Sequence, residues 1–237
     1  MTRAGRLRHY AGMATDIAGV VFDAYGTLLD IYAVEARLEA LYPGKGRALS
    51  LRWRDKQIEY SRLRTMSGRY ADFWSITGDA LDYACEFEKA TLTPAARNEL
   101  MAIYERLPAH PEVPGALAAL RAKGLKLAVL SNGNETMLRK ALAAAQIEPL
   151  FSHVLSVERV RKFKTAPEAY QLGPDAFGAP VQNLVFVSSN GWDAAGAAWF
   201  GFRAFWINRA GAPLERLGVA PEGTGKTMDD LAGFLGL

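Results

Sequence analysis

The hydrophobic positions follow two different patterns along this chain. Five short apolar runs have the length and continuity of strands that are buried on both faces. They occupy residues 17–22, 125–130, 153–156, 184–187 and 203–207. Around the last four runs the apolar positions recur with the helical period, at residues 115–123, 135–145, 167–177 and 193–200. Short strands that alternate with helices predict an α/β fold with a doubly wound parallel sheet.

The long stretch between the first two runs has helical periodicity and no convincing strand. It predicts helices at residues 34–41, 48–65, 71–88 and 94–107. The return segment, residues 108–115, contains three prolines and is expected to be stiff. A final helix is predicted from Met228. We therefore expect a flexible N-terminal extension (1–14), an α/β core (15–32 and 109–237) and a helical cap (33–108) that covers the crevice of the sheet as a lid.

Composition restricts the class of protein. Hydrophobic residues make up 50% of the 237 positions, enough for a large core, and no apolar run reaches the roughly 18 to 20 residues of a membrane-spanning helix. The basic N-terminal residues lack the apolar stretch of a secretory signal, so we expect a cytoplasmic protein. The net charge of +3 comes from 28 basic and 25 acidic residues that are interspersed, which favours a small anionic substrate over nucleic acid.

Cysteine and histidine are too scarce for several kinds of site. Cys85 is the single cysteine, so an internal disulfide and a cysteine-based metal cluster are excluded. The three histidines lie far apart in the sequence and give a zinc site or a His-dependent triad little to build on. The chemistry must rest on carboxylate, Lys, Arg and hydroxyl groups.

Polar residues follow several of the apolar segments at the point where each ends. Asp23 comes directly after the first run, Gly26 permits a sharp turn, and Thr27 carries a hydroxyl that can orient the carboxylate. Three more clusters follow other segments, at residues 131–134, Lys164 and residues 188–193. Each cluster alone is explained as a turn or a helix cap. Because the carboxyl ends of parallel strands meet at one crevice, the four together predict an active site with Asp23 as nucleophile.

These motifs resemble those of the haloacid dehalogenase superfamily and, within it, of the L-2-haloacid dehalogenases. The resemblance covers nearly the whole chain from Ile17 onward. It rests on residues 23–27, 53–60, 68–74, 130–133, 163–164 and 188–193 and on Tyr170. Two positions depart from the family pattern, because Thr165 stands where Pro is common and Asp55 stands where Gln is common.

The resemblance implies a two-step hydrolysis of short-chain L-2-haloalkanoic acids. Asp23 attacks C2 with inversion, the halide leaves, and water hydrolyses the aspartyl ester to release a D-2-hydroxy acid. The implied catalytic residues are Asp23, Thr27, Arg54, Ser131, Lys164, Ser188, Asn190 and Asp193. The implied residues for binding substrate or halide are Tyr25, Arg54, Ile58, Phe73, Ser131, Asn132, Tyr170 and Trp192.

The resemblance also gives the polar groups their roles. Lys164 lies beside Asp23, and its charge offsets the repulsion between two anions, which is about 4 kcal/mol at 4 Å and an effective dielectric constant of 20. Arg54 accepts the halide and Ser131 binds the substrate carboxylate. The implied water site consists of Ser188, Asn190 and Asp193.

Tyr25 separates this interpretation from a phosphatase. Phosphatases of the superfamily carry an acid two residues after the nucleophile, whereas a phenol with a pKa of about 10 is a poor proton donor at neutral pH and a departing halide needs no proton. We therefore expect no metal and no cofactor.

The alternatives are a hydrolase of an azetidine-2-carboxylate-like ring or of a phosphate ester, and a binding protein that has lost activity. By analogy with the family we expect a homodimer. From the interspersed charges and the short apolar runs we expect no nucleic-acid or membrane partner.

Overall fold

The computed structural model describes residues 17–237, and the expected N-terminal extension lies outside the described residues. Its centre is a six-stranded parallel sheet with the strand order β3-β2-β1-β4-β5-β6. The strands are β1 (Gly19–Phe22), β2 (Leu127–Ser131), β3 (His153–Ser156), β4 (Leu184–Ser188), β5 (Arg203–Ile207) and β6 (Gly223–Gly225). The order steps outward from β1 in both directions, which confirms the doubly wound α/β fold.

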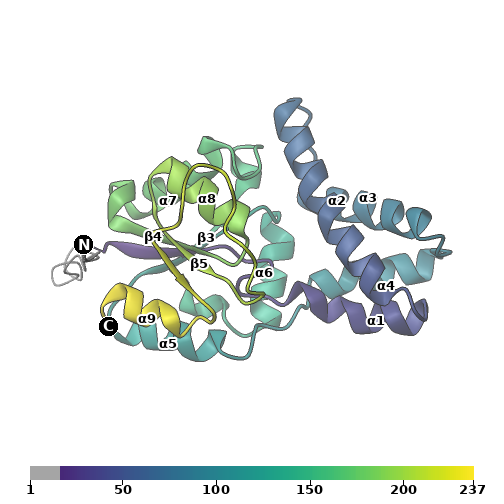
Figure 1. Ribbon diagram of the computed structural model, residues 1–237, viewed down its shortest axis with the longest axis horizontal. Coiled ribbons are helices and arrows are strands. Elements are labelled where there is room, and N and C mark those ends of the chain that lie inside the picture. The colour runs from purple at the N-terminus through teal and green to yellow at the C-terminus, as the bar shows by residue number, and fades with distance from the viewer. Residues whose placement is uncertain (1–16) are drawn as a thin grey trace, which may run out of the picture.

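Helices cover both faces of this sheet. In Figure 1, α7 and α8 lie on one face and α5 and α9 on the other. The helices of this core are α5 (Val113–Ala122), α6 (Glu135–Ala144), α7 (Pro167–Phe177), α8 (Gly191–Phe200) and α9 (Asp230–Leu235). Short 3₁₀ helices are Ile31–Ala33, Glu148–Leu150, Val157–Arg159 and Val181–Asn183. Because both faces are covered, the four residues of β1 are all buried, as their unbroken apolar run predicts.

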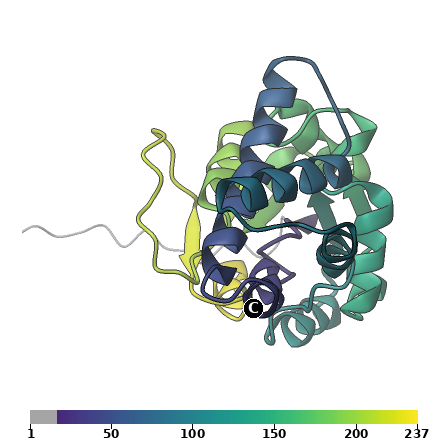
Figure 2. The ribbon, with the colours of Figure 1, turned by 90° about the vertical axis from the view of Figure 1, so that its right-hand side faces the viewer.

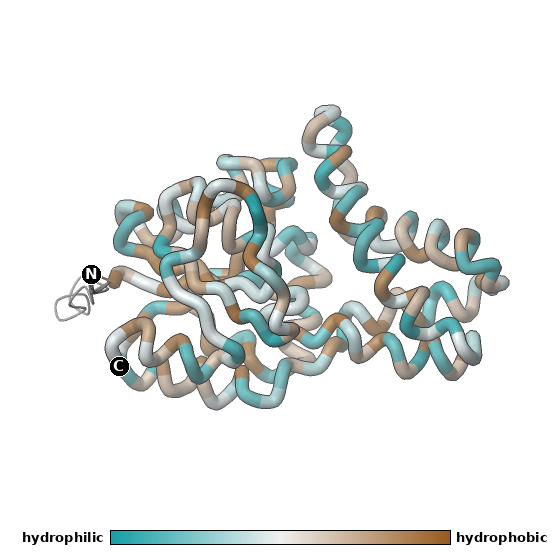
Figure 3. The backbone as a smooth tube through the Cα atoms, viewed as in Figure 1, coloured by the Kyte–Doolittle hydropathy of each residue, from teal (hydrophilic) through white to brown (hydrophobic). Residues whose placement is uncertain are grey.

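A separate helical domain is inserted between β1 and α5. It consists of α1 (Val34–Leu41), α2 (Gly46–Met66), α3 (Phe73–Phe87) and α4 (Pro94–Tyr104). Figure 1 places it beyond the end of the sheet at which β1 stops, and Figure 2 views the molecule from the side of this cap. Hydrophobic and hydrophilic positions alternate along its helices, as expected for helices that bury one face (Figure 3).

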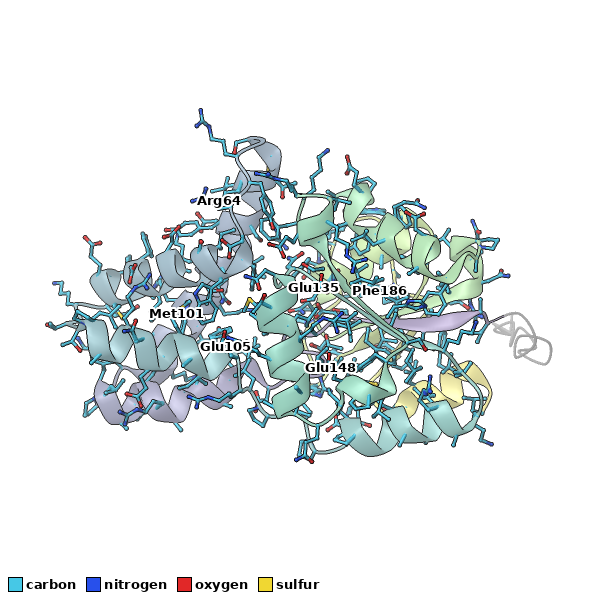
Figure 4. The ribbon with its side chains drawn as sticks, turned by 180° about the vertical axis from the view of Figure 1, so that it is seen from behind. Arg64, Met101, Glu105, Glu135, Glu148 and Phe186 are labelled. Carbon is cyan, nitrogen blue, oxygen red and sulfur yellow. The ribbon has the colours of Figure 1, made fainter. Side chains whose placement is uncertain are left out.

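Two contacts define the start of α3 within the cap and one junction between cap and core. Helix α3 starts at Phe73, two residues later than expected, because Asp72 caps it by accepting hydrogen bonds from the N–H groups of Trp74 and Ser75. Glu105, labelled in Figure 4, follows α4 and forms an ion pair with Lys140 of α6 at 2.8 Å.

Among the described residues, no helix is both long and apolar enough to cross a membrane.

Candidate active site

Asp23 lies immediately after β1, at the end of the central strand that points toward the cap (Figure 1). The residue is 6% exposed. Thr27 Oγ1 and Asn190 Nδ2 donate to Asp23 Oδ2 at 2.8 and 2.9 Å, and Lys164 Nζ donates to Oδ1 at 3.0 Å. Gly26 has a φ of 94°, which lets the chain turn back so that Thr27 reaches the carboxylate. The carboxylate is therefore held in one orientation by neighbours from three parts of the chain.

Lys164 connects Asp23 to Asp193. Its Nζ lies 3.0 Å from Asp23 Oδ1 and 2.9 Å from Asp193 Oδ2. The same atom lies 4.9 Å from the ring centroid of Phe186, a core residue that Figure 4 labels. Burial opposes the charged form, but the carboxylates of Asp193 and Asp23 outweigh it and raise the pKa of Lys164 above its usual value. The backbone N–H of Lys164 donates to Asn132 Oδ1 at 3.0 Å. Lys164 is thus a buried ammonium group fixed at both its backbone and its tip.

Asp193 is fully buried at the start of α8 and receives a second donor from Tyr170. The Tyr170 hydroxyl lies 2.7 Å from Asp193 Oδ1 and 3.1 Å from the Asp193 carbonyl oxygen. Burial raises the pKa of Asp193, and the charge of Lys164 counteracts that effect. Tyr170 is itself fully buried, behind Asp193. The Tyr170 hydroxyl therefore contacts Asp193, and the expected role of Tyr170 in substrate binding stays a prediction.

Arg54 reaches the core from cap helix α2. Its Nη2 donates to the Tyr25 carbonyl at 3.2 Å and to Asn190 Oδ1 at 3.4 Å, and its Nη1 lies 3.5 Å from Gln57 Oε1. The residue is 9% exposed. All of these acceptors are neutral, and within residues 17–237 Arg54 forms no ion pair with a carboxylate. A nearly buried cation with only neutral acceptors attracts an anion.

Ser131 and Ser188 end two strands beside β1, and both are fully buried. Ser131 Oγ accepts a hydrogen bond from the N–H of Gly133 at 3.0 Å, and Ser188 Oγ accepts one from the N–H of Asn190 at 3.1 Å. Each hydroxyl keeps its own hydrogen for a further acceptor. The two serines therefore shape the loops that carry the site and retain a donor each.

Two residues outside the predicted set hold the loop that follows Asp23. Ser189 donates from Oγ to the Gly26 carbonyl at 2.6 Å and from its N–H to Thr27 Oγ1 at 2.8 Å. Arg209 donates to the carbonyls of Gly26 and Thr27 at 3.2 and 3.0 Å and forms an ion pair with Glu112 at 2.8 Å. Ser189 belongs to a predicted cluster, and the one sequence signal for Arg209 is its position just after the 203–207 run.

A groove of about 560 Å³ opens next to Arg54 and Asn190. Ile58 and Trp192 line it, and so do Asp55 and Arg62. The contact of Ile58 and Trp192 with substrate stays a prediction. The Arg62 guanidinium carbon lies 4.8 Å from the Trp192 ring centroid. The groove therefore joins the residues around Asp23 to the surface between the cap and the core.

Phe73 and Tyr25 are buried and do not belong to the lining of this groove. They are 1% and 3% exposed, and their ring centroids are 6.2 Å apart. Burial raises the pKa of Tyr25 far above its usual value, so the phenol is neutral. Among the described residues the Tyr25 hydroxyl has no hydrogen-bond partner. Within that part of the chain the Tyr25 hydroxyl is therefore a further donor without an acceptor, like the hydroxyls of Ser131 and Ser188.

The donors around Asp23 do not form a ligand set for a divalent metal. In the described part of the chain, no three His, Cys, Asp or Glu side chains are grouped closely enough to hold a metal ion. The two carboxylates at the centre, Asp23 and Asp193, already share the ammonium group of Lys164. Hard cations such as Mg²⁺ prefer several free oxygen ligands. The arrangement suits a negatively charged nucleophile that works between two cations.

Comparisons with known proteins agree with this geometry. A sequence model of a family described as haloacid dehalogenase-like hydrolase matches residues 17–201. An (S)-2-haloacid dehalogenase of Pseudomonas sp. (strain YL) is 41% identical over 206 residues, 87% of this chain and 89% of that protein. Haloacetate dehalogenase H-2 of Moraxella sp. (strain B) is 41% identical over 213 residues, 90% of this chain and 95% of that protein.

Two solved structures are also similar. The crystal structure of the L-2-haloacid dehalogenase RSc1362 has a TM-score of 0.92 at 53% identity and covers 94% of this chain and 100% of that one. The L-2-haloacid dehalogenase from Xanthobacter autotrophicus, solved with chloropropionic acid covalently bound, has a TM-score of 0.86 at 36% identity and covers 92% of this chain and 98% of that one.

Proposed function

This chain belongs to the L-2-haloacid dehalogenases among the haloacid dehalogenase-like hydrolases, and on that premise we propose that it hydrolyses short-chain L-2-haloalkanoic acids to D-2-hydroxy acids. The observation that carries the proposal is the pair of cations on either side of Asp23. Lys164 lies 3.0 Å from its carboxylate, and Asn190 bridges the same carboxylate to Arg54. Both a carboxylate nucleophile and an anionic substrate are accommodated between two positive charges.

In the first step an oxygen of Asp23 forms a bond to C2 while the carbon–halogen bond breaks. The halide takes the bonding electron pair and leaves toward Arg54, whose acceptors are neutral. Thr27 keeps the carboxylate oriented through its 2.8 Å hydrogen bond. The substrate carboxylate binds Ser131 and the N–H groups after β1. Attack from the side opposite the halide inverts C2, and an aspartyl ester remains on Asp23.

In the second step water adds to the carbonyl carbon of that ester. The acyl–oxygen bond breaks, and the Asp23 carboxylate returns with one oxygen from water. One of the two protons of the water goes to the departing alkoxide, which leaves as the D-2-hydroxy acid, and the other is released to solvent. We assign the water to the neighbourhood of Asn190, Ser188 and Asp193, which lie beside the nucleophile. Asp193 in addition holds Lys164 in place, at 2.9 Å. The Xanthobacter autotrophicus protein was solved with chloropropionic acid covalently bound, which supports a covalent intermediate in this chain.

No metal takes part in these steps. Asp23 needs a countercharge, and Lys164 supplies it from within the core. A phosphate-ester hydrolase needs a proton donor for its leaving alcohol at the position of Tyr25, whose pKa burial raises away from the working range. The ring opening of an azetidine-2-carboxylate-like substrate also needs a proton on the departing nitrogen. The halide substrate therefore fits the described residues best.

The test is chloride release from L- and D-2-chloropropionate in the presence of EDTA, by the wild type and Asp23→Asn. We expect release from the L-form alone, unaffected by EDTA and abolished in the variant. A single turnover in H₂¹⁸O adds the chemistry, because an ester intermediate puts ¹⁸O into Asp23 and leaves the first product unlabelled. Label in the first product, or equal turnover of both enantiomers, contradicts the proposal.

A further inference from the structure

Gln57 is a fully buried polar side chain inside the cap, about one helical turn along α2 from Arg54. Its Oε1 lies 3.5 Å from Arg54 Nη1 and 3.3 Å from the Tyr104 hydroxyl. Its Nε2 donates to Thr77 Oγ1 at 3.0 Å. The amide therefore links α2 to α3 and α4, and one end of it meets the cation that faces the nucleophile.

The neighbouring hydroxyls determine which way this amide points. Thr77 donates its only hydroxyl hydrogen to the Phe73 carbonyl at 2.7 Å, so it can only accept from Gln57. The amide nitrogen must then face Thr77. Burial raises the pKa of Tyr104 to about 12, so its hydroxyl stays protonated and donates to Oε1. Both contacts direct the oxygen of Gln57 toward Arg54.

We infer that Gln57 is a positioning residue that aims Arg54 at the departing halide, an inference that rests on the proposed function. Gln57 holds Nη1, while the Tyr25 carbonyl and Asn190 Oδ1 hold Nη2. An amide oxygen fixes the guanidinium without neutralising it, whereas a carboxylate at this position would form a buried ion pair. The orientation of one amide thus keeps the positive charge of Arg54 available to an anion.

Gln57→Glu tests the charge requirement, with bromide as the probe. The inhibition constant of bromide against L-2-chloropropionate is expected to rise at least about tenfold, which corresponds to about 1.4 kcal/mol. Gln182→Glu is the matched control, since it makes the same substitution at an exposed residue and is expected to leave the constant unchanged. A purely structural role predicts instead a lower yield of active enzyme with the bromide constant unchanged, and that result overturns the inference.

Thr77→Val tests the orientation requirement without adding charge. It removes the hydroxyl that accepts from Gln57 Nε2, so the amide loses one of the two bonds that fix its direction and keeps only the contact with Tyr104. We expect weaker bromide inhibition in Thr77→Val and restored inhibition in Thr77→Ser, which keeps the hydroxyl. Equal inhibition in the two variants would overturn the inference, even if both are less stable than the wild type.

Crystals soaked in sodium bromide separate this inference from the proposed function. Anomalous scattering is expected to locate bromide beside Arg54 in the wild type and not in Gln57→Glu. A wild type that binds bromide there but releases no chloride from chloropropionate refutes the proposed substrate and leaves the positioning role supported. A wild type without bromide beside Arg54, or a variant with undiminished bromide, overturns the positioning role.

Discussion

Replacing Lys164 by Met is expected to destabilise the protein at neutral pH far more than an ordinary loss of charge. The ammonium group is 1% exposed and is shared by Asp23 and Asp193 at 3.0 and 2.9 Å. Breaking a buried ion pair by removing one partner costs about 3 to 5 kcal/mol, because the other charge stays buried without compensation. A domain with about 5 to 15 kcal/mol of stability can lose this much and still fold.

The loss has a defined dependence on pH. Burial already raises the pKa of Asp193, and Lys164 is the charge that counteracts this. Without Lys164 the folded-state pKa of Asp193 rises further above its unfolded value. An acid whose pKa is raised by folding binds more protons in the folded state, so stability falls as pH rises through that window and recovers as pH falls. The destabilisation should therefore be smaller at pH 5 than at pH 8.

The assay is equilibrium unfolding in urea, followed by far-UV circular dichroism at both pH values. Lys162→Met is the matched control, because Lys162 pairs with Glu168 on the surface, where the two side chains are 46% and 47% exposed. Exposed pairs contribute about 0 to 1 kcal/mol, so this variant should remain close to the wild type. Equal losses in the two variants, or a loss in Lys164→Met that grows on acidification, would refute the reasoning.

Three further predictions concern activity. Tyr170→Phe removes a donor to the buried Asp193 carboxylate, so urea unfolding should show a loss of about 1 to 3 kcal/mol in unfolding free energy. Chloride release should show a lower kcat and an unchanged KM, and an unchanged kcat would contradict the view that Tyr170 positions Asp193. Asp55→Gln should change the bromide inhibition constant less than about twofold, because Asp55 is exposed and its charge is screened, and a tenfold change would show that Asp55 pulls on Arg54. Asp193 and Asp23 raise the pKa of Lys164, although burial opposes them, so chloride release should not decline between pH 8 and pH 10. A fall of kcat within that range would show that the ammonium group of Lys164 loses its proton there.

The pattern of apolar residues was sufficient to predict most of the fold. The predicted ranges 34–41, 153–156, 167–177 and 203–207 coincide with α1, β3, α7 and β5. These segments combine strong periodicity with clear ends, such as Pro167 at the start of α7 and Gly178 after it. Strand β6 was not predicted, because Gly-Thr-Gly has no apolar run and pairs only because β5 offers it an edge. The boundaries of the cap and the homodimer stay predictions.

The sequence by itself determined which chemical groups meet at the sheet's edge. Asp23 follows β1 and Asn190 follows β4, and the ends of these strands converge in any doubly wound parallel sheet, so their neighbourhood follows from strand order. Lys164 is different, because residues 160–163 form no strand and Lys164 lies in the loop between β3 and α7. Tertiary structure alone decided how those groups are held. Tyr170 lies behind Asp193, and Gln57 directs Arg54, because of the faces that two helices turn inward. Such contacts depend on the rotation of each helix about its axis and on the relative placement of cap and core. The order of residue types along the chain does not by itself predict either of these.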